Sequence, residues 1–329
     1  MSGEPIIKAI NLKKWFPLRR GFLETLLSRK KLYVKAVDGV SFEIYPGEIF
    51  GLAGESGCGK TTTGRVLLRL VDPSDGKIIF DGVDITKLSQ KQLKPYRRYM
   101  QIVFQDPYES LNPRMTIYDI IAEPLRVQKV VDDPAEEEKL IHQTLEDVEL
   151  SPPEEFVYRY PHELSGGQRQ RVAIARAFIL KPKFVVADEP VSMLDVSIRG
   201  EILKVMLKER EKHGTAILFI THDLSLARHI CERIAIMYLG KIVEMGDTER
   251  VILEPMHPYT QALIAAVPVP DPDYKRGKIP IKGEVPSPIN LPSGCRFHPR
   301  CPYASDICRE KEPPLVNVNG RLVACHKYA

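Results

Sequence analysis

Short apolar runs, bounded by polar or turn residues, recur through the first 250 residues of the chain. An apolar run of about four to eight residues is typical of a strand buried in a parallel sheet, and alternation is typical of a half-buried strand. The segments that predict strands are 6–16, 40–44, 49–53, 77–80, 101–105, 184–187, 216–220, 234–238 and 241–245. The segments that predict helices are 62–70, 136–150 and 169–180. This mixture favours the α/β fold class.

Prolines set two further parts of the chain apart from this pattern. Six prolines, from Pro107 to Pro153, break the segment 107–161 into short pieces, and we interpret this segment as a helical subdomain inserted into the α/β core. Beyond Gly246 the chain is again rich in proline and cannot form long regular elements. We therefore predict a first domain at 1–250 and a C-terminal region at 251–329.

The composition and charge narrow the class of protein. The 329 residues are 43% apolar and 27% charged, which is ordinary for a globular protein. The net charge of +4 is too small to indicate a nucleic-acid footprint. No apolar run approaches the ~20 residues of a membrane span, and residues 1–16 lack the apolar core of a signal peptide, so we expect a cytoplasmic chain. The basic segment 17–35 is expected to be a solvated loop rather than a surface for anionic lipid.

Residues 54–61 read Gly-Glu-Ser-Gly-Cys-Gly-Lys-Thr and fit the phosphate-binding pattern G-x-x-x-x-G-K-[ST]. They follow a predicted strand and precede a predicted helix, so that backbone amides at the helix N-terminus point at an anion. Lys60 is expected on the β- and γ-phosphates and the Thr61 hydroxyl on Mg²⁺. The predicted ATP-binding residues of this P-loop are Gly54, Glu55, Ser56, Gly57, Cys58, Gly59, Lys60, Thr61 and Thr62. The chain is therefore predicted to bind a nucleoside triphosphate.

Polar residues also follow two of the other buried strands. Asp188 and Glu189 come directly after the run at 184–187, where an acid beside a P-loop can serve Mg²⁺. His222 follows the run at 216–220, and Leu-Ser-Gly-Gly-Gln at 164–168 opens the helix predicted at 169–180. Together, and in this order, these motifs resemble the ATPase subunits of ABC transporters. The resemblance covers about residues 6–250, and Arg-Gln-Arg-Val at 169–172 extends it.

The resemblance implies a fold and a set of catalytic roles. The fold is a P-loop NTPase (RecA-like) core with an antiparallel β subdomain, the inserted helical subdomain and a Cys-rich C-terminal appendage. Glu189 is implied as the general base that polarises the attacking water, and His222 as the residue that contacts the γ-phosphate. Gln105 is implied to reach both that water and Mg²⁺, whose ligands are then Thr61, Gln105 and Asp188.

The resemblance also implies a second ATPase subunit. The residues implied to bind ATP held by that subunit are Leu164, Ser165, Gly166, Gly167 and Gln168. Asp195 matches the loop that links the two sites, where Met193 replaces the more frequent Ala. An aromatic residue after the first strand is implied to stack on adenine, and alignment favours Phe16 over Trp15.

Several stretches are similar to the oligopeptide/dipeptide importer branch, whose relatives also carry nickel or oligosaccharides. They are Gln-Asp-Pro at 105–107, Ser-Leu-Asn-Pro-Arg at 110–114, His-Pro-Tyr-Thr at 257–260 and Arg-Phe-His-Pro-Arg at 296–300. The implied partners are two transmembrane permease subunits, a paralogous ATPase subunit and, indirectly, an extracytoplasmic solute-binding protein. The implied location is peripheral, on the cytoplasmic face of the cell membrane, and no nucleic acid is expected.

Two other function classes fit less well. A soluble ABC-type ATPase of DNA repair or translation carries a long coiled-coil insertion or two cassettes, and this sequence has neither. An ordinary P-loop kinase would not need the motif at 164–168. We keep the soluble ABC-type ATPase of DNA repair or translation as the alternative function.

Four cysteines, Cys295, Cys301, Cys308 and Cys325, are spaced C-x5-C-x6-C-x16-C near the C-terminus. Their region is poor in apolar residues, so thiolate–metal bonds are a candidate source of its order. Both Zn²⁺ and an iron–sulfur cluster take four cysteines, whereas two disulfides disagree with a cytoplasmic location. The importer resemblance points to a [4Fe–4S] cluster, which we favour over Zn²⁺.

Overall fold

The computed structural model describes residues 3–18, 32–267, 281 and 283–329. The described chain separates into two compact units. Unit 1 consists of Met1–Ile7, Ile44–Glu48 and Phe80–Phe219, and unit 2 consists of Lys8–Glu43, Ile49–Ile79 and Ile220–Ala329. Most of the basic segment predicted to be a solvated loop, residues 19–31, lies outside the described residues.

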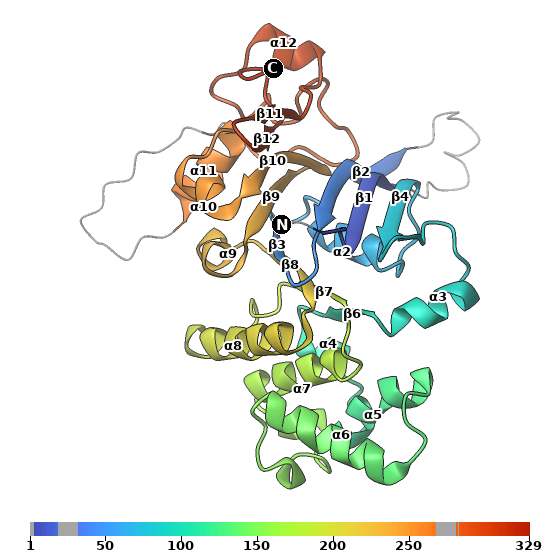
Figure 1. The fold of residues 1–329 in the computed structure, drawn as a ribbon. Helices are drawn as coiled ribbons and strands as arrows, with labels where there is room; N and C mark the ends of the chain where they lie inside the picture. The colour runs from blue at the N-terminus through green and yellow to red at the C-terminus, as the bar shows by residue number, and fades with distance from the viewer. Residues whose placement is uncertain (1–2, 19–31, 268–280, 282) are drawn as a thin grey trace, which may run out of the picture. The chain divides into compact units, whose positions relative to one another are not determined.

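Unit 1 combines a parallel sheet with a group of helices (Figure 1). Its strands are β5 (Val83–Asp84), β6 (Met100–Val103), β7 (Phe184–Asp188) and β8 (Ala216–Thr221). Its α-helices are α3 (Gln90–Arg97), α4 (Pro107–Ser110), α5 (Ile117–Gln128), α6 (Pro134–Asp147), α7 (Gly166–Phe178) and α8 (Val196–His213), with 3₁₀ turns at Pro153–Glu155 and Pro161–Glu163. The neighbours run β8-β7-β6, and β6 pairs parallel with β7 so that Val103 lies opposite Ala187. Every residue of β7 and β8 is buried, which explains their uninterrupted apolar sequences.

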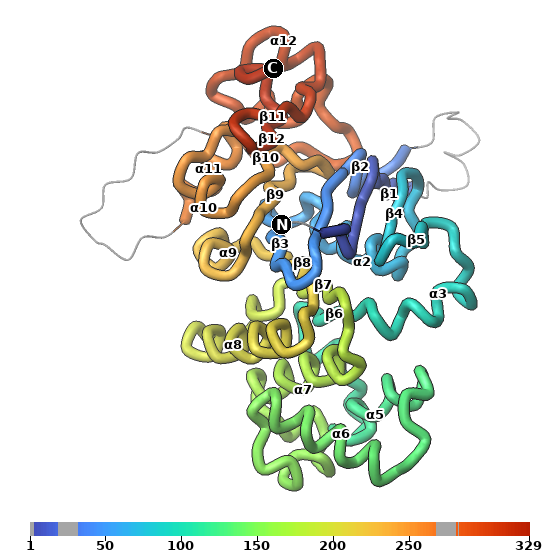
Figure 2. The backbone as a smooth tube through the Cα atoms, viewed as in Figure 1, coloured from blue at the N-terminus to red at the C-terminus, as the bar shows by residue number. Residues whose placement is uncertain are grey.

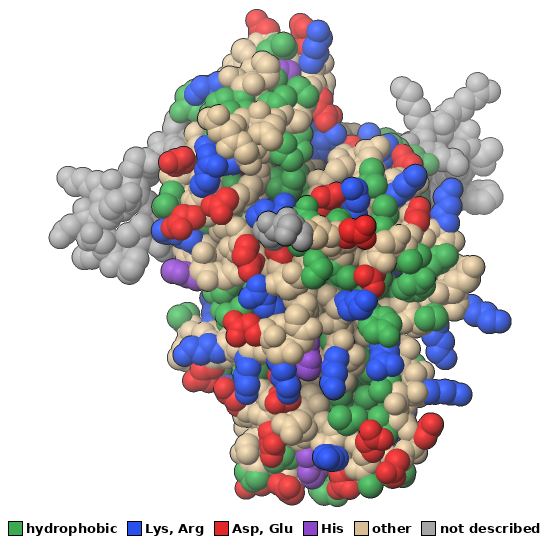
Figure 3. All heavy atoms as spheres, viewed as in Figure 1, with side chains coloured by type: hydrophobic (Ala, Val, Ile, Leu, Met, Phe, Trp, Pro, Cys, Tyr) green, Lys and Arg blue, Asp and Glu red, His purple; other side chains and the backbone are tan. Residues whose placement is uncertain are grey.

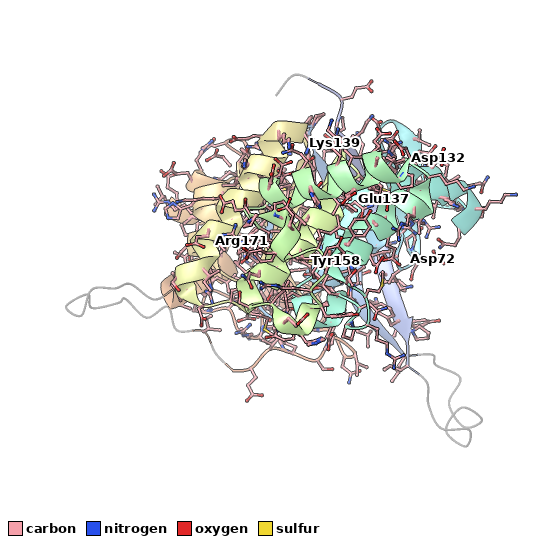
Figure 4. All side chains as sticks on the ribbon, turned by 90° about the horizontal axis from the view of Figure 1, so that it is seen from below. Asp72, Asp132, Glu137, Lys139, Tyr158 and Arg171 are labelled. Carbon is pink, nitrogen blue, oxygen red and sulfur yellow. The ribbon has the colours of Figure 1, made fainter. Side chains whose placement is uncertain are left out.

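The helices of unit 1 pack around α7. Helix α7 contacts α4, α5, α6 and α8, and the tube drawing shows α5, α6 and α7 as neighbours (Figure 2). Helices α5 and α6 are also joined by an ion pair, in which Arg126 Nη2 donates to Glu137 Oε1 over 2.7 Å. Arg171, on α7, donates to the carbonyl oxygen of Val148 beyond the end of α6 (2.9 Å); Figure 4 labels Glu137 and Arg171. These polar contacts fix the helices against each other.

Unit 2 contains strands from both ends of the chain. Its strands are β1 (Ile7–Pro17), β2 (Tyr33–Ile44), β3 (Ile49–Ala53), β4 (Asp75–Phe80), β9 (Arg233–Tyr238), β10 (Lys241–Asp247), β11 (Val316–Val318) and β12 (Arg321–Val323). Its helices are α2 (Lys60–Leu67), α9 (Leu224–Ile230), α10 (Thr248–Leu253), α11 (Pro258–Ala266) and α12 (Asp306–Glu310). One sheet has the neighbours β2-β1-β4, and the other has β11-β12-β10-β9-β3.

The hairpin predicted around Leu239-Gly240 is confirmed. Strands β9 and β10 pair antiparallel, and Leu239 and Gly240 both have positive φ, 42° and 83°, as a tight hairpin turn requires. Strand β3 pairs parallel with β9, with Leu52 opposite Ala235. The strand that leads into the P-loop is therefore held in the sheet by its neighbour β9.

The C-terminal part of unit 2 is ordered by its contacts with the strands. In Figure 1 the strands β11 and β12 continue the sheet beyond β10, and Glu244 of β10 pairs with Val323 of β12. The side chain of Phe297 is 1% exposed, and its ring lies 5.3 Å from that of Tyr238 and 5.4 Å from that of Tyr259. Backbone pairing and this aromatic cluster supply the order that the sequence alone did not explain.

The prediction of an iron–sulfur cluster at Cys295, Cys301, Cys308 and Cys325 is therefore wrong. Among the described residues, no three Cys, His, Asp or Glu side chains gather so that they could hold a metal ion. None of the four cysteines forms a disulfide, and burial raises the pKa of the Cys295 thiol to about 11. The Zn²⁺ alternative used the same four ligands and has no support either. The prediction failed because it gave thiolate–metal bonds more weight than docking onto the ATPase core, whereas the structure shows the region docked onto β10.

The distribution of charged side chains on the surface agrees with the composition of the chain, and so do the lengths and hydrophobicity of its helices. Acidic and basic side chains are interspersed over the face drawn in Figure 3, as the near balance of 47 basic and 43 acidic residues suggests. None of the helices in the described ranges is long and apolar enough to cross a membrane.

Candidate functional site

The P-loop lies in unit 2 between β3 and α2, and its glycines are required by the backbone. Gly59 has φ 109°, and a Cβ there would lie 2.0 Å from the carbonyl oxygen of Ala36. A Cβ at Gly54 would lie 2.2 Å from the carbonyl oxygen of Met237. Real Cβ atoms do not approach carbonyl oxygens this closely, so a side chain at either position would displace the loop.

The charged and polar groups of the loop are arranged around its backbone. Lys60 is 5% exposed, and its Nζ donates to the carbonyl oxygens of Gly54 (2.8 Å) and Glu55 (3.0 Å). Ser56 and Gly57 are exposed, while Thr61 and Thr62 are half-buried. The first turn of α2 contains no acidic residue and, among the described contacts, no side chain caps it. Its amides and the ammonium group of Lys60 therefore suit a phosphate anion.

Cys58 lies beneath the loop rather than on its surface. Its side chain is buried, and burial raises the pKa of the Cys58 thiol. Its carbonyl oxygen accepts a hydrogen bond from the backbone N–H of Gly240 (2.8 Å), in the β9–β10 hairpin. Cys58 is thus a small packing residue of the loop.

Three of the predicted catalytic and Mg²⁺-binding residues lie in unit 1, at the ends of β6 and β7. These strands are parallel neighbours, so the residues that follow them emerge at one edge of the sheet. The Nε2 of Gln105 donates to Oε2 of Glu189 over 3.0 Å. Asp188 is the last residue of β7 and is buried, and Glu189 follows with φ 46°. The structure therefore brings the side chains of Gln105 and Glu189 together.

The motif Leu164–Gln168 forms the N-terminus of α7, also in unit 1. Ser165 is the N-cap: its Oγ accepts from the N–H of Gln168 (3.3 Å), and Oε1 of Gln168 accepts from the N–H of Ser165 (2.9 Å). This reciprocal capping leaves the Ser165 hydroxyl proton to be donated to an anion. Leu164 is buried beside the cap, and a Cβ at Gly167 would lie 2.9 Å from Cγ2 of Ile198.

The capping box also explains a small error in the sequence prediction. The helix predicted from residue 169 begins at Gly166, because Ser165 and Gln168 satisfy its first amides. Downstream of Glu189, Asp195 is the residue directly before α8. The side chain of Met193, two residues earlier, is exposed.

His222 and the two aromatic candidates for adenine lie in unit 2. His222 is exposed between β8 and α9, next to Asp223, whose side chain caps α9. Phe16 is 39% exposed, with Nζ of Lys14 5.0 Å from its ring centroid. Trp15 is half-buried, and its Nε1 donates to Oδ1 of Asp38 over 2.9 Å. The prediction of Phe16 over Trp15 stays a prediction.

The residues that hold Glu55 could not be identified from sequence patterns. Tyr259 and Arg300 both contact it, although they are 204 and 245 residues away along the chain. His-Pro-Tyr-Thr at 257–260 and Arg-Phe-His-Pro-Arg at 296–300 resemble the importer branch, but the contacts of Tyr259 and Arg300 with the P-loop leave no signal in the sequence.

Two family models of transporters match this chain, one in its N-terminal portion and one in its C-terminal portion. Residues 37–192 match the family described as ABC transporter, and residues 243–308 match the family described as oligopeptide/dipeptide transporter, C-terminal region. The chain is 48% identical to the probable peptide ABC transporter ATP-binding protein y4tS of Sinorhizobium fredii, with 99% of this chain and 91% of that protein covered. It is also 48% identical to the oligopeptide transport ATP-binding protein AppF of Bacillus subtilis, with 100% and 99% covered.

Solved structures show the same relationship for the fold. The ATP-binding cassette MJ0796, described as a dimer bound to ADP and Pi after hydrolysis, has a TM-score of 0.62 and 28% identity, covering 74% of this chain and 98% of that one. CbiO1 from Clostridium perfringens, part of the ABC transporter complex cbiONQ, has a TM-score of 0.64 and 26% identity, covering 77% and 92%. The predicted α/β P-loop NTPase core agrees with these neighbours.

Proposed function

Because this chain belongs to the ATP-binding subunits of the oligopeptide/dipeptide ABC transporter family, we propose that it hydrolyses ATP to drive peptide import through two transmembrane permease subunits. An ATPase coupled to transport follows from membership of the family. The names of its relatives, which specify peptides or oligopeptides, favour peptides over nickel or oligosaccharides. An ATPase of DNA repair or translation is not favoured.

The observation that carries the proposed chemistry is the contact between Gln105 and Glu189. A general base needs one oxygen directed at the proton that it accepts. Gln105 Nε2 donates to Oε2 of Glu189 over 3.0 Å, and this hydrogen bond orients the carboxylate for the attacking water. Glu189 accepts a proton from that water, and Gln105 fixes the orientation of the carboxylate.

The remaining residues bind and orient the nucleotide. The P-loop amides and Lys60 suit the β- and γ-phosphates, and Thr61, Gln105 and Asp188 carry the oxygen ligands that Mg²⁺ prefers. When bound, Mg²⁺ neutralises charge on the phosphates. His222 is assigned to the γ-phosphate and Phe16 to the adenine ring.

We assign Leu164, Ser165, Gly166, Gly167 and Gln168 to the ATP held by a second ATPase subunit. The support is the Ser165 hydroxyl at the N-terminus of α7, a position that favours anions. The second subunit is proposed to be a paralogue, so that the pair is a heterodimer. The pair is proposed to lie on the cytoplasmic face of the membrane and to receive peptides from an extracytoplasmic binding protein through the permeases.

We also propose the finer architecture that the resemblance implied. Residues 1–250 would form the nucleotide-binding domain, with β1, β2 and β4 in its antiparallel subdomain and residues 107–161 as the helical subdomain that faces the permeases. Residues 251–329 would form the C-terminal region. The support for the helical subdomain is the packing of α4, α5 and α6 around α7.

Reconstitution tests the proposed function. The chain, its permease subunits, the paralogous ATPase and the binding protein are placed in proteoliposomes, and uptake of labelled oligopeptide, Ni²⁺ or oligosaccharide is measured with and without Mg·ATP. We expect ATP-dependent uptake of peptide only, and its loss with Lys60→Ala. Uptake of Ni²⁺ or oligosaccharide without peptide would contradict the proposed substrate.

A further inference from the structure

Glu55, the second residue of the P-loop, is held at its side chain, its N–H and its carbonyl oxygen. Its two carboxylate oxygens accept a bidentate pair of hydrogen bonds from Nη1 (2.8 Å) and Nη2 (3.0 Å) of Arg300. Its backbone N–H donates to the hydroxyl of Tyr259 over 2.8 Å. Its carbonyl oxygen accepts from Nζ of Lys60 over 3.0 Å. All four residues lie in unit 2.

Arg300, which pairs with the Glu55 carboxylate, is itself packed against aromatic rings. The side chains of Arg300 and Glu55 are 8% and 27% exposed, so solvent screens their ion pair only in part. The guanidinium of Arg300 lies 5.8 Å from the ring centroid of Tyr238 and 5.9 Å from that of Phe297. Its hydrogen bonds to Glu55 raise the pKa of Arg300 further above its usual value, so it stays charged. Planar bidentate pairing of this kind specifies geometry as well as charge.

A second arginine of the same short segment reaches the P-loop through the hairpin. Arg296 pairs with Asp38 and also donates to the carbonyl oxygen of Leu239. The next residue, Gly240, accepts from the N–H of Asp38 (2.8 Å) and donates its own N–H to the carbonyl oxygen of Cys58 (2.8 Å). The segment Arg296–Arg300 therefore contacts the loop directly at Glu55 and indirectly at Cys58.

We infer that Arg300 and Tyr259 are positioning residues for ATP binding, through which the C-terminal region holds the P-loop and its Lys60 in the phosphate-binding conformation. This rests on the proposed binding of ATP at the P-loop. Glu55 is the link: a loop whose Glu55 peptide is free to rotate loses the carbonyl that orients the Lys60 ammonium group. Preorganisation of that ammonium group lowers the cost of binding the phosphates.

The test is Mg·ATP binding to the full chain, measured by calorimetry, which gives affinity and stoichiometry separately. Tyr259→Phe removes one hydroxyl, and Glu55→Gln removes one charge with little change of shape. Arg300→Gln removes the other charge, and Arg300→Lys restores it without the bidentate geometry. The matched control is Arg309→Gln, because Arg309 belongs to an exposed pair with Asp306 in the same region.

We expect Kd to rise about 5- to 30-fold in Glu55→Gln and Arg300→Gln, since one partly buried charge-assisted pair is lost in each. Tyr259→Phe should raise Kd by a smaller factor, and Arg300→Lys should recover part of the loss. The double variant of Glu55 and Arg300 should bind no more weakly than either single variant, because both remove one interaction. Stoichiometry should stay near one per chain, whereas mere unfolding would lower it.

Three results would overturn the inference. They are a Kd within twofold of the wild type in folded Glu55→Gln and Tyr259→Phe, an equal rise of Kd in the Arg309→Gln control, and additive losses in the double variant. The variant Lys60→Ala distinguishes a failure of the positioning role from a failure of ATP binding at the P-loop. If Lys60→Ala abolishes binding while the Glu55 variants bind normally, only the positioning role fails; if Lys60→Ala binds normally, the P-loop assignment itself fails.

Discussion

His257 makes the stability of unit 2 depend on pH in a range that can be measured. The ring is buried beside Phe297, at 5.8 Å between centroids, and its Nδ1 accepts from the N–H of Tyr259 (3.1 Å). Burial lowers the pKa of His257 from 6.5 to about 3. The imidazole is therefore neutral in the folded chain throughout the range from pH 7 to pH 5.

The sign of the effect follows from the two protonation states. Below pH 6.5 the unfolded chain binds a proton at His257, while the folded chain does so only below about pH 3. The contribution of neutral His257 to the free energy of unfolding is therefore fully present above pH 6.5 and is lost as the pH decreases toward 3. Integrating the difference for one group from pH 7 to pH 5 gives a loss of about 2 kcal/mol.

The assay is urea unfolding of the wild type and of His257→Asn at pH 7, 6 and 5. Trp15, the single tryptophan of the chain, lies in unit 2, so its fluorescence reports the right transition. The Asn side chain can still accept from the N–H of Tyr259 but does not titrate. The variant should be less stable at pH 7, because the buried ring is lost, and its free energy of unfolding should fall less on acidification. Burial raises the pKa of nearby Glu244, which opposes the trend in both proteins and cancels in their difference.

The stability gap between wild type and variant should thus shrink by about 2 kcal/mol between pH 7 and pH 5. A gap that stays constant over this range would show that His257 is not held neutral by burial, and the reasoning would be refuted.

Three further changes test other parts of the account. Phe297→Ala should destabilise unit 2 by about 3–5 kcal/mol in the same fluorescence assay, and a chelator should leave the unfolding of the wild type unchanged. A wild type that is destabilised by the chelator, together with an unaffected Phe297→Ala variant, would contradict this account of the C-terminal region. Gly59→Ala should abolish ATP binding while circular dichroism stays native, because the new Cβ would lie 2.0 Å from the carbonyl oxygen of Ala36. Wild-type affinity would disprove the required loop geometry. Ser165→Arg should block hydrolysis but leave ATP binding at Lys60 intact, and full turnover by a monomeric chain would refute action on a partner's nucleotide.

Local patterns predicted the nucleotide-binding elements well. Strand β7 is buried on both faces, so its apolar run was continuous, and the acids after it were visible as a break in that run. The P-loop was readable because glycine, lysine and threonine at fixed spacing encode one backbone shape. In contrast, α8 was missed: over its 18 residues only Ile202, Leu203, Val205, Met206 and Glu209 are buried, which is too weak a stripe to recognise.

Contacts between distant parts of the chain were beyond prediction. The pairing of β12 with β10 and the hydrogen bonds of Arg300 to Glu55 depend on three-dimensional proximity and leave no periodic signal. Without them the C-terminal region looked too poor in apolar residues to fold, which led to the incorrect iron–sulfur prediction. The contacts that order this region come from the sheet of unit 2.

The most direct test of the central claim is ATP turnover by Glu189→Gln in the assembled transporter, with Glu201→Gln as the matched control. Glu201 lies in the same unit and pairs with the largely buried Arg171, and 62% of the Glu201 side chain is itself exposed. We expect Glu189→Gln to bind Mg·ATP with near wild-type affinity, to trap an ATP-bound dimer, and to lose about 10²- to 10⁴-fold in kcat, as for removal of a general base. Glu201→Gln should turn over normally. Hydrolysis and peptide uptake by Glu189→Gln at the wild-type rate would contradict the account.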